Sequence, residues 1–96
     1  MKTLYIISQS PYQRMETLFP FKIADKDDAV LLLQNGVLLC KSVPSCVADD
    51  FHRAIVRGVK IYGLKEDFEA RGITPQCDVV DYKGAIKLFE QYDRTV

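Results

Sequence analysis

The chain has 96 residues, of which 48% are hydrophobic and 27% are charged, a composition typical of a soluble globular protein with one domain over residues 1–96. Thirteen basic residues balance thirteen acidic ones, which argues against direct binding of nucleic acid through a basic face. No apolar run approaches the roughly 18–20 residues of a membrane span, and three cysteines make no secreted disulfide framework, so we expect a cytoplasmic protein with reduced thiols.

The first predicted elements are a strand and a helix. The unbroken apolar segment Leu4-Tyr5-Ile6-Ile7 predicts a strand over Thr3–Ser8 that is buried on both faces. This segment is too short for the apolar part of a signal peptide. Ser10 and Pro11 then suit the cap and the first turn of a helix, and Pro20 ends or kinks that helix.

A second apolar strand is predicted over Ala29–Leu33, and it stops at the polar break Gln34-Asn35-Gly36. The apolar run Val37 to Cys40 follows, either as a short strand or as a buried loop. In an open α/β sheet, ligands and chemistry collect just beyond the carboxyl ends of the strands. We therefore expect functional residues near this break.

The rest of the chain continues to alternate between helix-like and strand-like segments, which predicts an α/β fold with a mostly parallel sheet of about four to five strands flanked by helices. The last helix is capped by Asp81. The expected elements are a helix with the apolar face Val47, Phe51, Ala54 and Ile55 that ends at Gly58; a strand over Val59–Tyr62; a charged helix over Lys65–Arg71 that ends at Gly72; a strand over Cys77–Val80; and a last helix with Tyr82, Ile86, Leu88 and Phe89 pointing inward.

Cysteines are the first candidates for catalysis, because a reactive thiol needs partial exposure and a field that favours thiolate. Cys40 precedes Lys41 and lies beyond a predicted strand. Cys46 lies near the start of the second predicted helix, where the positive end of the helix dipole favours an anion. Burial as a small apolar residue is the alternative for both, and it is the expected state of Cys77.

Other chemistry has little support in the sequence. Cys46 and the single histidine, His52, are six residues apart and would point in different directions on one helix. Cys40 and Cys46 are not spaced as a structural zinc pair, and no glycine-rich phosphate loop is present, so we expect neither a metal nor a cofactor. Glu66, Asp67 and Glu69 are interpreted as a solvated helix face.

Four segments, in order over most of the chain, resemble the DsrH/TusB family of small sulfur-relay proteins, which has the DsrE-like fold. The third is the most specific. The segments are Ser10-Pro11-Tyr12; Leu31-Leu32-Leu33-Gln34-Asn35-Gly36-Val37; Ile61-Tyr62-Gly63-Leu64-Lys65-Glu66-Asp67-Phe68-Glu69-Ala70-Arg71-Gly72; and Val79-Val80-Asp81-Tyr82, followed by an apolar helix.

The resemblance implies a three-layer α/β domain of the DsrEFH type and a role in passing persulfide sulfur between proteins. In the TusB branch the sulfur goes toward 2-thiolation of the wobble uridine of tRNA, and in the DsrH branch it belongs to sulfur oxidation. It also implies assembly with DsrE/TusD-like and DsrF/TusC-like sister subunits, with the main sulfur-carrying cysteine on the DsrE/TusD-type sister.

The chain departs from the family pattern in its first helix, where DsrH-type members can carry a cysteine. When the segment between Ser10-Pro11 and Gln34-Asn35-Gly36 is aligned with the family without gaps, Pro20 stands at the position of that cysteine. Its absence favours the TusB branch and an accessory role. Two alternatives stay open. One is a direct sulfurtransferase that carries persulfide on Cys40 or Cys46. The other is a self-associating binding module without sulfur chemistry, because fold alone does not fix function.

Overall fold

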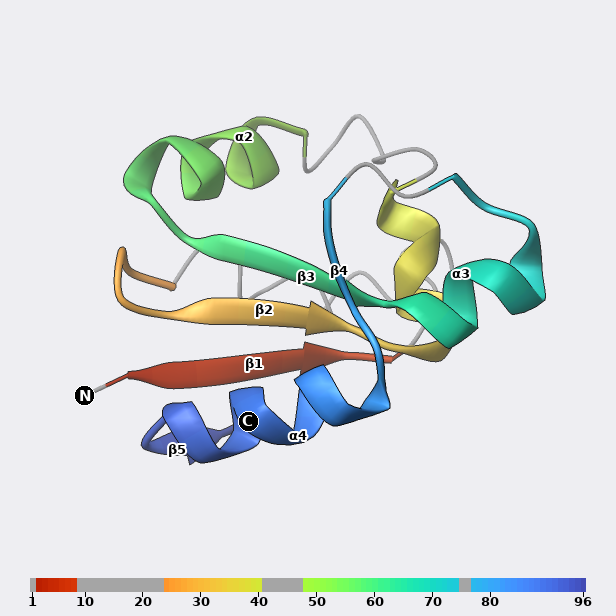
Figure 1. Cartoon of the computed structure of the whole chain (residues 1–96). Helices are drawn as coiled ribbons and strands as arrows, with labels where there is room; N and C mark the ends of the chain where they lie inside the picture. Colours follow the sequence, from red (N-terminus) through yellow and green to blue (C-terminus); the bar gives the residue numbers. More distant parts are fainter. Residues whose placement is uncertain (1, 9–23, 41–47, 75–76) are drawn as a thin grey trace.

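Five parallel strands form the central sheet of the computed structural model, which describes residues 2–8, 24–40, 48–74 and 77–96. The strands lie in the order β4-β3-β2-β1-β5, and every neighbouring pair is parallel (Figure 1). Their bounds are β1 Thr3–Ile7, β2 Ala29–Leu32, β3 Lys60–Leu64, β4 Asp78–Val80 and β5 Arg94–Thr95. The predicted α/β class with a mostly parallel sheet is confirmed.

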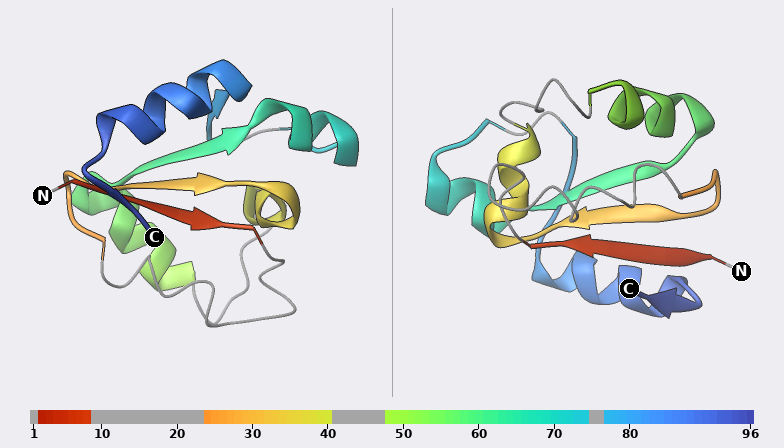
Figure 2. Two further views of the ribbon diagram at one scale, coloured as in Figure 1. Left: turned by 90° about the horizontal axis from the view of Figure 1, so that it is seen from below. Right: turned by 180° about the vertical axis from the view of Figure 1, so that it is seen from behind.

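Helices α2 (Ala48–Arg57) and α4 (Tyr82–Gln91) lie on opposite faces of this sheet (Figure 2). The strand order explains why. The connection from β2 to β3 moves outward in one direction across the sheet, whereas the connection from β4 to β5 returns across it. Because crossovers between parallel strands are right-handed, reversing the direction moves the connecting helix to the other face. The result is the expected three-layer arrangement.

The middle strand β2 is buried on both sides. Val30, Leu31 and Leu32 have no exposed surface, which is why the sequence shows an unbroken apolar run here and no alternation. Asp28, just before β2, is a buried carboxylate that accepts hydrogen bonds from the N–H groups of Thr3 and Asp25, each at 2.9 Å. These bonds tie the start of β1 to the turn that leads into β2 and satisfy the buried charge.

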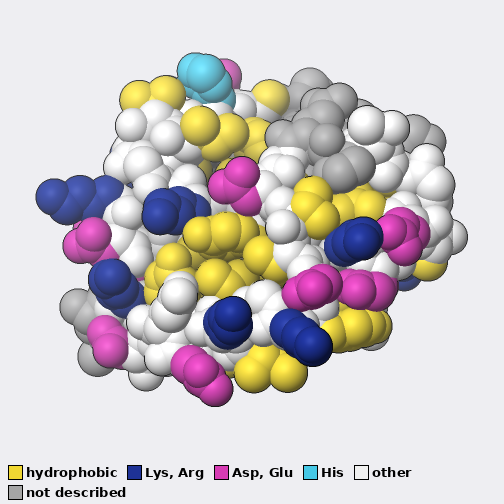
Figure 3. All heavy atoms as spheres, viewed as in Figure 1, with side chains coloured by type: hydrophobic (Ala, Val, Ile, Leu, Met, Phe, Trp, Pro, Cys, Tyr) yellow, Lys and Arg dark blue, Asp and Glu magenta, His cyan; other side chains and the backbone are white. Residues whose placement is uncertain are grey.

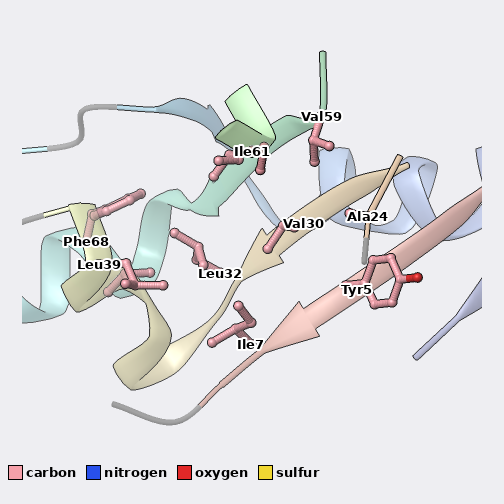
Figure 4. Close-up of a cluster of buried hydrophobic side chains, with 11 residues drawn as sticks. Tyr5, Ile7, Ala24, Val30, Leu32, Leu39, Val59, Ile61 and Phe68 are labelled. Atoms are coloured by element: carbon pink, nitrogen blue, oxygen red, sulfur yellow. The ribbon is translucent and has the colours of Figure 1, made fainter. Parts of the chain in front are cut away.

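The larger core cluster fills the α2 side of the sheet (Figure 4). It combines strand residues with side chains from α2, from the 3-10 helix η2 (Gln34–Cys40) and from α3 (Lys65–Arg71). Each fully buried aliphatic or phenyl side chain contributes about 1.5–3 kcal/mol to folding. The cluster consists of Tyr5, Ile7, Ala24, Val30, Leu32, Val37, Leu39, Ala54, Val59, Ile61 and Phe68.

A smaller core cluster lies on the other side, between the sheet and α4. Its buried members are Leu4, Ala29, Leu31, Leu64, Ala85 and Leu88. Only Ala85 and Leu88 of α4 are buried, whereas Tyr82, Ile86 and Phe89 are 61%, 57% and 40% exposed. The prediction that these last three side chains point inward was wrong, and only Leu88 meets it.

Two further elements differ from the sequence-based expectation. Val37 to Cys40 belongs to η2 and is neither a strand nor an irregular loop, although Val37 and Leu39 are buried as a core segment. β5 was not expected as a separate element, because its two residues are polar and exposed. The predicted first helix from Ser10 to Pro20 lies outside the described residues.

Within the described ranges, none of the helices is both long enough and apolar enough to cross a membrane.

Candidate functional site

The carboxyl ends of β1, β2 and β3 meet at one edge of the sheet, where Gln34-Asn35-Gly36 begins η2. The chain passes close to β1 here. The Leu33 N–H donates to the Ile7 carbonyl at 2.9 Å, and a Cβ atom on Gly36 would collide with that same oxygen. Only glycine allows this approach, so Gly36 fixes where the turn leaves the sheet.

The turn is held from the side by α3. Gln34 has a left-handed φ of 48°, and its N–H donates to Asp67 Oδ2 at 2.7 Å. The other carboxylate oxygen of Asp67 faces Arg71 Nη1 at 3.3 Å, and Arg71 Nε donates to Asn35 Oδ1 at 3.1 Å. The Asp67 and Arg71 side chains are only 17% and 27% exposed, so this pair is better shielded than a surface ion pair. We call these four residues the turn clamp.

The local sequence of α3 places both of its clamp residues on one side of the helix. Asp67 and Arg71 are four residues apart, and Phe68 anchors the helix in the core. Gly72 then ends the helix in a left-handed conformation with φ 63°. The Ile73 N–H accordingly returns to the Phe68 carbonyl at 3.0 Å. The helix over Lys65–Arg71 and its glycine stop are confirmed.

The turn clamp changes the interpretation of the α3 carboxylates. Asp67 is not part of a solvated face, because it holds the Gln34 turn. Glu69 is exposed and pairs with Lys65 at 3.9 Å, whereas Glu66 buries its Oε1 with no hydrogen bond to the described residues. Asp67 and Glu69 therefore have different partners, and no paired-carboxylate site is formed by them. The i, i+4 spacing of Asp67 and Arg71 signals their ion pair in the sequence, but not the contact of Asp67 with Gln34.

The remaining candidate residues from the sequence are the three cysteines and His52. Cys40 is the last residue of η2, the seven-residue helix that Gln34 begins. Cys46 lies outside the described residues. Cys77 directly precedes β4 and packs, partly buried, against the core on the α2 side, as expected for a small apolar residue. His52 is exposed on α2.

A groove of about 300 Å³ opens beside the turn clamp, between α4, the sheet and α3. We call it the α4 groove. Its floor is formed by Leu33 and Leu64. Its wall comes from Tyr82, Ala85, Ile86 and Phe89, and its polar end from Gln34 and Asp67.

Tyr92 packs against the core cluster on the same face of the sheet as the groove. Burial, followed by the nearby Tyr62 and Asp28, raises the pKa of Tyr92 above its ordinary value of 10.0.

Comparison with known proteins identifies the family. A family model described as a DsrH-like protein matches residues 9–95. The chain belongs to the DsrH family. The family resemblance carried by the four sequence segments is thereby confirmed, and the chain is a subunit of a sulfur-relay system that works together with other relay subunits.

Curated relatives support the TusB side of this family. The chain is 34% identical over 90 residues to "Protein TusB" of Pectobacterium parmentieri, covering 88% of each chain. It is 33% identical over 90 residues to "Protein TusB" of Photorhabdus laumondii, again covering 88% of each chain.

The solution structure of protein Tm0979 from Thermotoga maritima has a similar fold, with a TM-score of 0.66 and 23% identity over 93% of this chain and 92% of that one. At this identity, the likeness supports the fold alone.

Proposed function

We propose that this chain is an accessory subunit of a sulfur-relay complex that passes persulfide sulfur toward 2-thiolation of the wobble uridine of tRNA. The observation that carries the proposal is the match to TusB proteins over 88% of both chains. The balanced charge of the chain fits a role in protein-to-protein relay better than direct contact with tRNA.

The accessory role is supported by what lies at the carboxyl edge of the sheet. The polar side chains of the turn clamp there hold the fold together: Arg71 binds Asn35 Oδ1 and pairs with Asp67, and Asp67 accepts the Gln34 N–H. At the position where DsrH-type members can carry a cysteine, the ungapped alignment gives Pro20. We propose that the main sulfur carrier is on a DsrE/TusD-like sister subunit, that a DsrF/TusC-like sister completes the complex, and that the complex acts in the cytoplasm.

The function is tested in a strain that lacks this gene. We expect loss of 2-thiolated wobble uridine, measured by mass spectrometry of tRNA nucleosides, and recovery when the wild-type gene is returned. An unchanged content of thiolated uridine in the deletion strain would show that the tRNA branch is wrong.

Cys40 is the first candidate for direct sulfur carriage by this chain, and Cys46 is the second. In such a transfer the thiolate attacks the outer sulfur of a donor persulfide, the donor S–S bond breaks, and the donor leaves as a thiolate, with no net oxidation. A Cys40→Ser variant distinguishes an accessory subunit from a subunit that carries sulfur on Cys40. If the chain is accessory, this variant restores thiolated uridine as fully as the wild type does.

Intact-protein mass spectrometry after incubation with a persulfide donor gives the second readout. We expect no sulfur atom to be retained by the wild-type chain. A gain of one sulfur that disappears in Cys40→Ser but persists in Cys46→Ser would instead establish Cys40 as a carrier, and the reverse pattern would establish Cys46.

A further inference from the structure

The α4 face of the sheet is only partly covered. Parallel sheets are normally packed on both faces, yet of the described elements only α4 lies over this one (Figure 2). Leu33, Tyr62 and Val80, next to α4 in the same cluster, are only partly buried. Figure 3 shows the result, a hydrophobic patch in the middle of this face with charged side chains around it.

The wall of the α4 groove has the spacing of a helix–helix contact. Tyr82, Ile86 and Phe89 follow one another at intervals of four and three residues and form one stripe along α4. This stripe lies about a quarter turn around the helix from Ala85 and Leu88, which face the sheet. α4 therefore has two apolar sides, of which its own sheet covers one.

We propose that the α4 groove receives an amphipathic helix from a sister subunit of the sulfur-relay complex. This inference rests on the proposed function, which supplies the sister subunit. The apolar stripe of the incoming helix would pack between the Tyr82-Ile86-Phe89 wall and the Leu33-Leu64 floor. Burying these half-exposed side chains supplies the driving force for association.

A second copy of this chain fits the groove poorly. The outer side of α4 carries Lys83, Lys87 and Glu90, all exposed. Because the inner side of α4 packs on its own sheet, a copy that placed its α4 in the groove would turn this charged side onto the Leu33-Leu64 floor. Burial of charges on an apolar surface without partners is costly. The occupant is therefore a helix with a different outer face.

The test uses the full chain co-expressed with its DsrE/TusD-like and DsrF/TusC-like sister subunits. In Ile86→Lys, a charge enters the centre of the groove wall, and we expect affinity for the sister subunits to fall by roughly 30-fold or more, as for a central interface anchor. The matched control is Val56→Lys, which places the same charge at a 72%-exposed position on α2, on the other face of the sheet. We expect the control to change affinity by less than about twofold.

Circular dichroism checks that both variants fold. Hydrogen exchange on the wild-type complex adds a readout that needs no variant, and we expect slower exchange on assembly in residues 82–89. Slower exchange confined to residues 48–57 would contradict the proposed docking face.

The outcomes separate the two proposals. If Ile86→Lys assembles with wild-type affinity, the groove assignment is wrong while the sulfur-relay function stands. If the wild-type chain does not bind the sister subunits, both are wrong. If light scattering shows a wild-type homodimer that Ile86→Lys converts to a monomer, the occupant is a second copy and the assignment of a sister helix is overturned.

Discussion

At the scale of single residues, α3 offers two ion pairs with the same i, i+4 spacing and different surroundings. Asp67 and Arg71 are largely shielded, and Asp67 also accepts the Gln34 N–H. Lys65 and Glu69 are 58% and 66% exposed, with a separation of 3.9 Å. Shielding and the backbone donor, not the spacing, determine how much each pair contributes.

Replacing Asp67 by alanine is therefore expected to lower the free energy of unfolding by about 1–3 kcal/mol, because the Gln34 N–H loses its acceptor and Arg71 loses its partner. Lys65→Ala, in the same helix, is expected to change the free energy of unfolding by less than about 0.5 kcal/mol. Urea unfolding of the two variants measures the difference. Equal losses would mean that Asp67 contributes no more than a surface charge.

The turn clamp also shows how much of this site can be predicted from the sequence. Gln34-Asn35-Gly36 was predicted as the break after β2, and the Lys65–Arg71 helix with its Gly72 stop was predicted from local pattern alone. The bond between Gln34 and Asp67 spans 33 residues. Local patterns contain no information about such a contact, so the clamp could be found only from the fold.

At the scale of elements, α4 shows how periodicity predicts a helix but not its orientation. Asp81 caps the helix as expected, with its side chain accepting the Gly84 N–H at 2.8 Å. The side chains Tyr82, Ile86, Leu88 and Phe89 are all apolar, and the sequence offers no way to distinguish a side packed on the sheet from a side that faces a groove. The structure separates them, because Leu88 lies with Ala85 on the sheet.

We expect Asp81→Ala to lower the free energy of unfolding by about 1 kcal/mol, since the first turn of α4 loses its cap. Asp78→Ala, which removes the same charge from an exposed position of β4, is the control. Far-ultraviolet circular dichroism during thermal unfolding measures both. A loss in the control as large as that in Asp81→Ala would indicate a general charge effect and not a cap.

At the scale of the whole molecule, the edge of the sheet beside β1 is covered by β5, close to the C-terminus. Arg94 and Thr95 pair with Thr3 and Leu4, and Val96 exchanges hydrogen bonds with β1 at 2.9 Å in both directions. This edge strand is only two residues long and polar, so it had no strand signal in the sequence. It nevertheless covers the polar backbone edge of the apolar strand β1.

Removing residues 93–96 is expected to expose that edge, to lower the melting temperature and to cause association of the protein, since an uncovered apolar strand pairs with other chains. The double substitution Arg94→Ala and Thr95→Ala retains the backbone bonds and is expected to behave like the wild type. Differential scanning calorimetry and size-exclusion chromatography would detect the contrast. A truncated chain as stable and monodisperse as the wild type would contradict this role.

The pairing of β1 with β5 also bears on how the protein is made. β1 leaves the ribosome well before its neighbour β5, because the other three strands lie between them in the sequence. One edge of β1 therefore stays unpaired during translation, and it can pair with β5 only when the segment after α4 has been synthesised. Contacts between such distant segments slow folding. The nascent chain consequently exposes an apolar strand edge for longer than a fold that pairs its strands in order of synthesis.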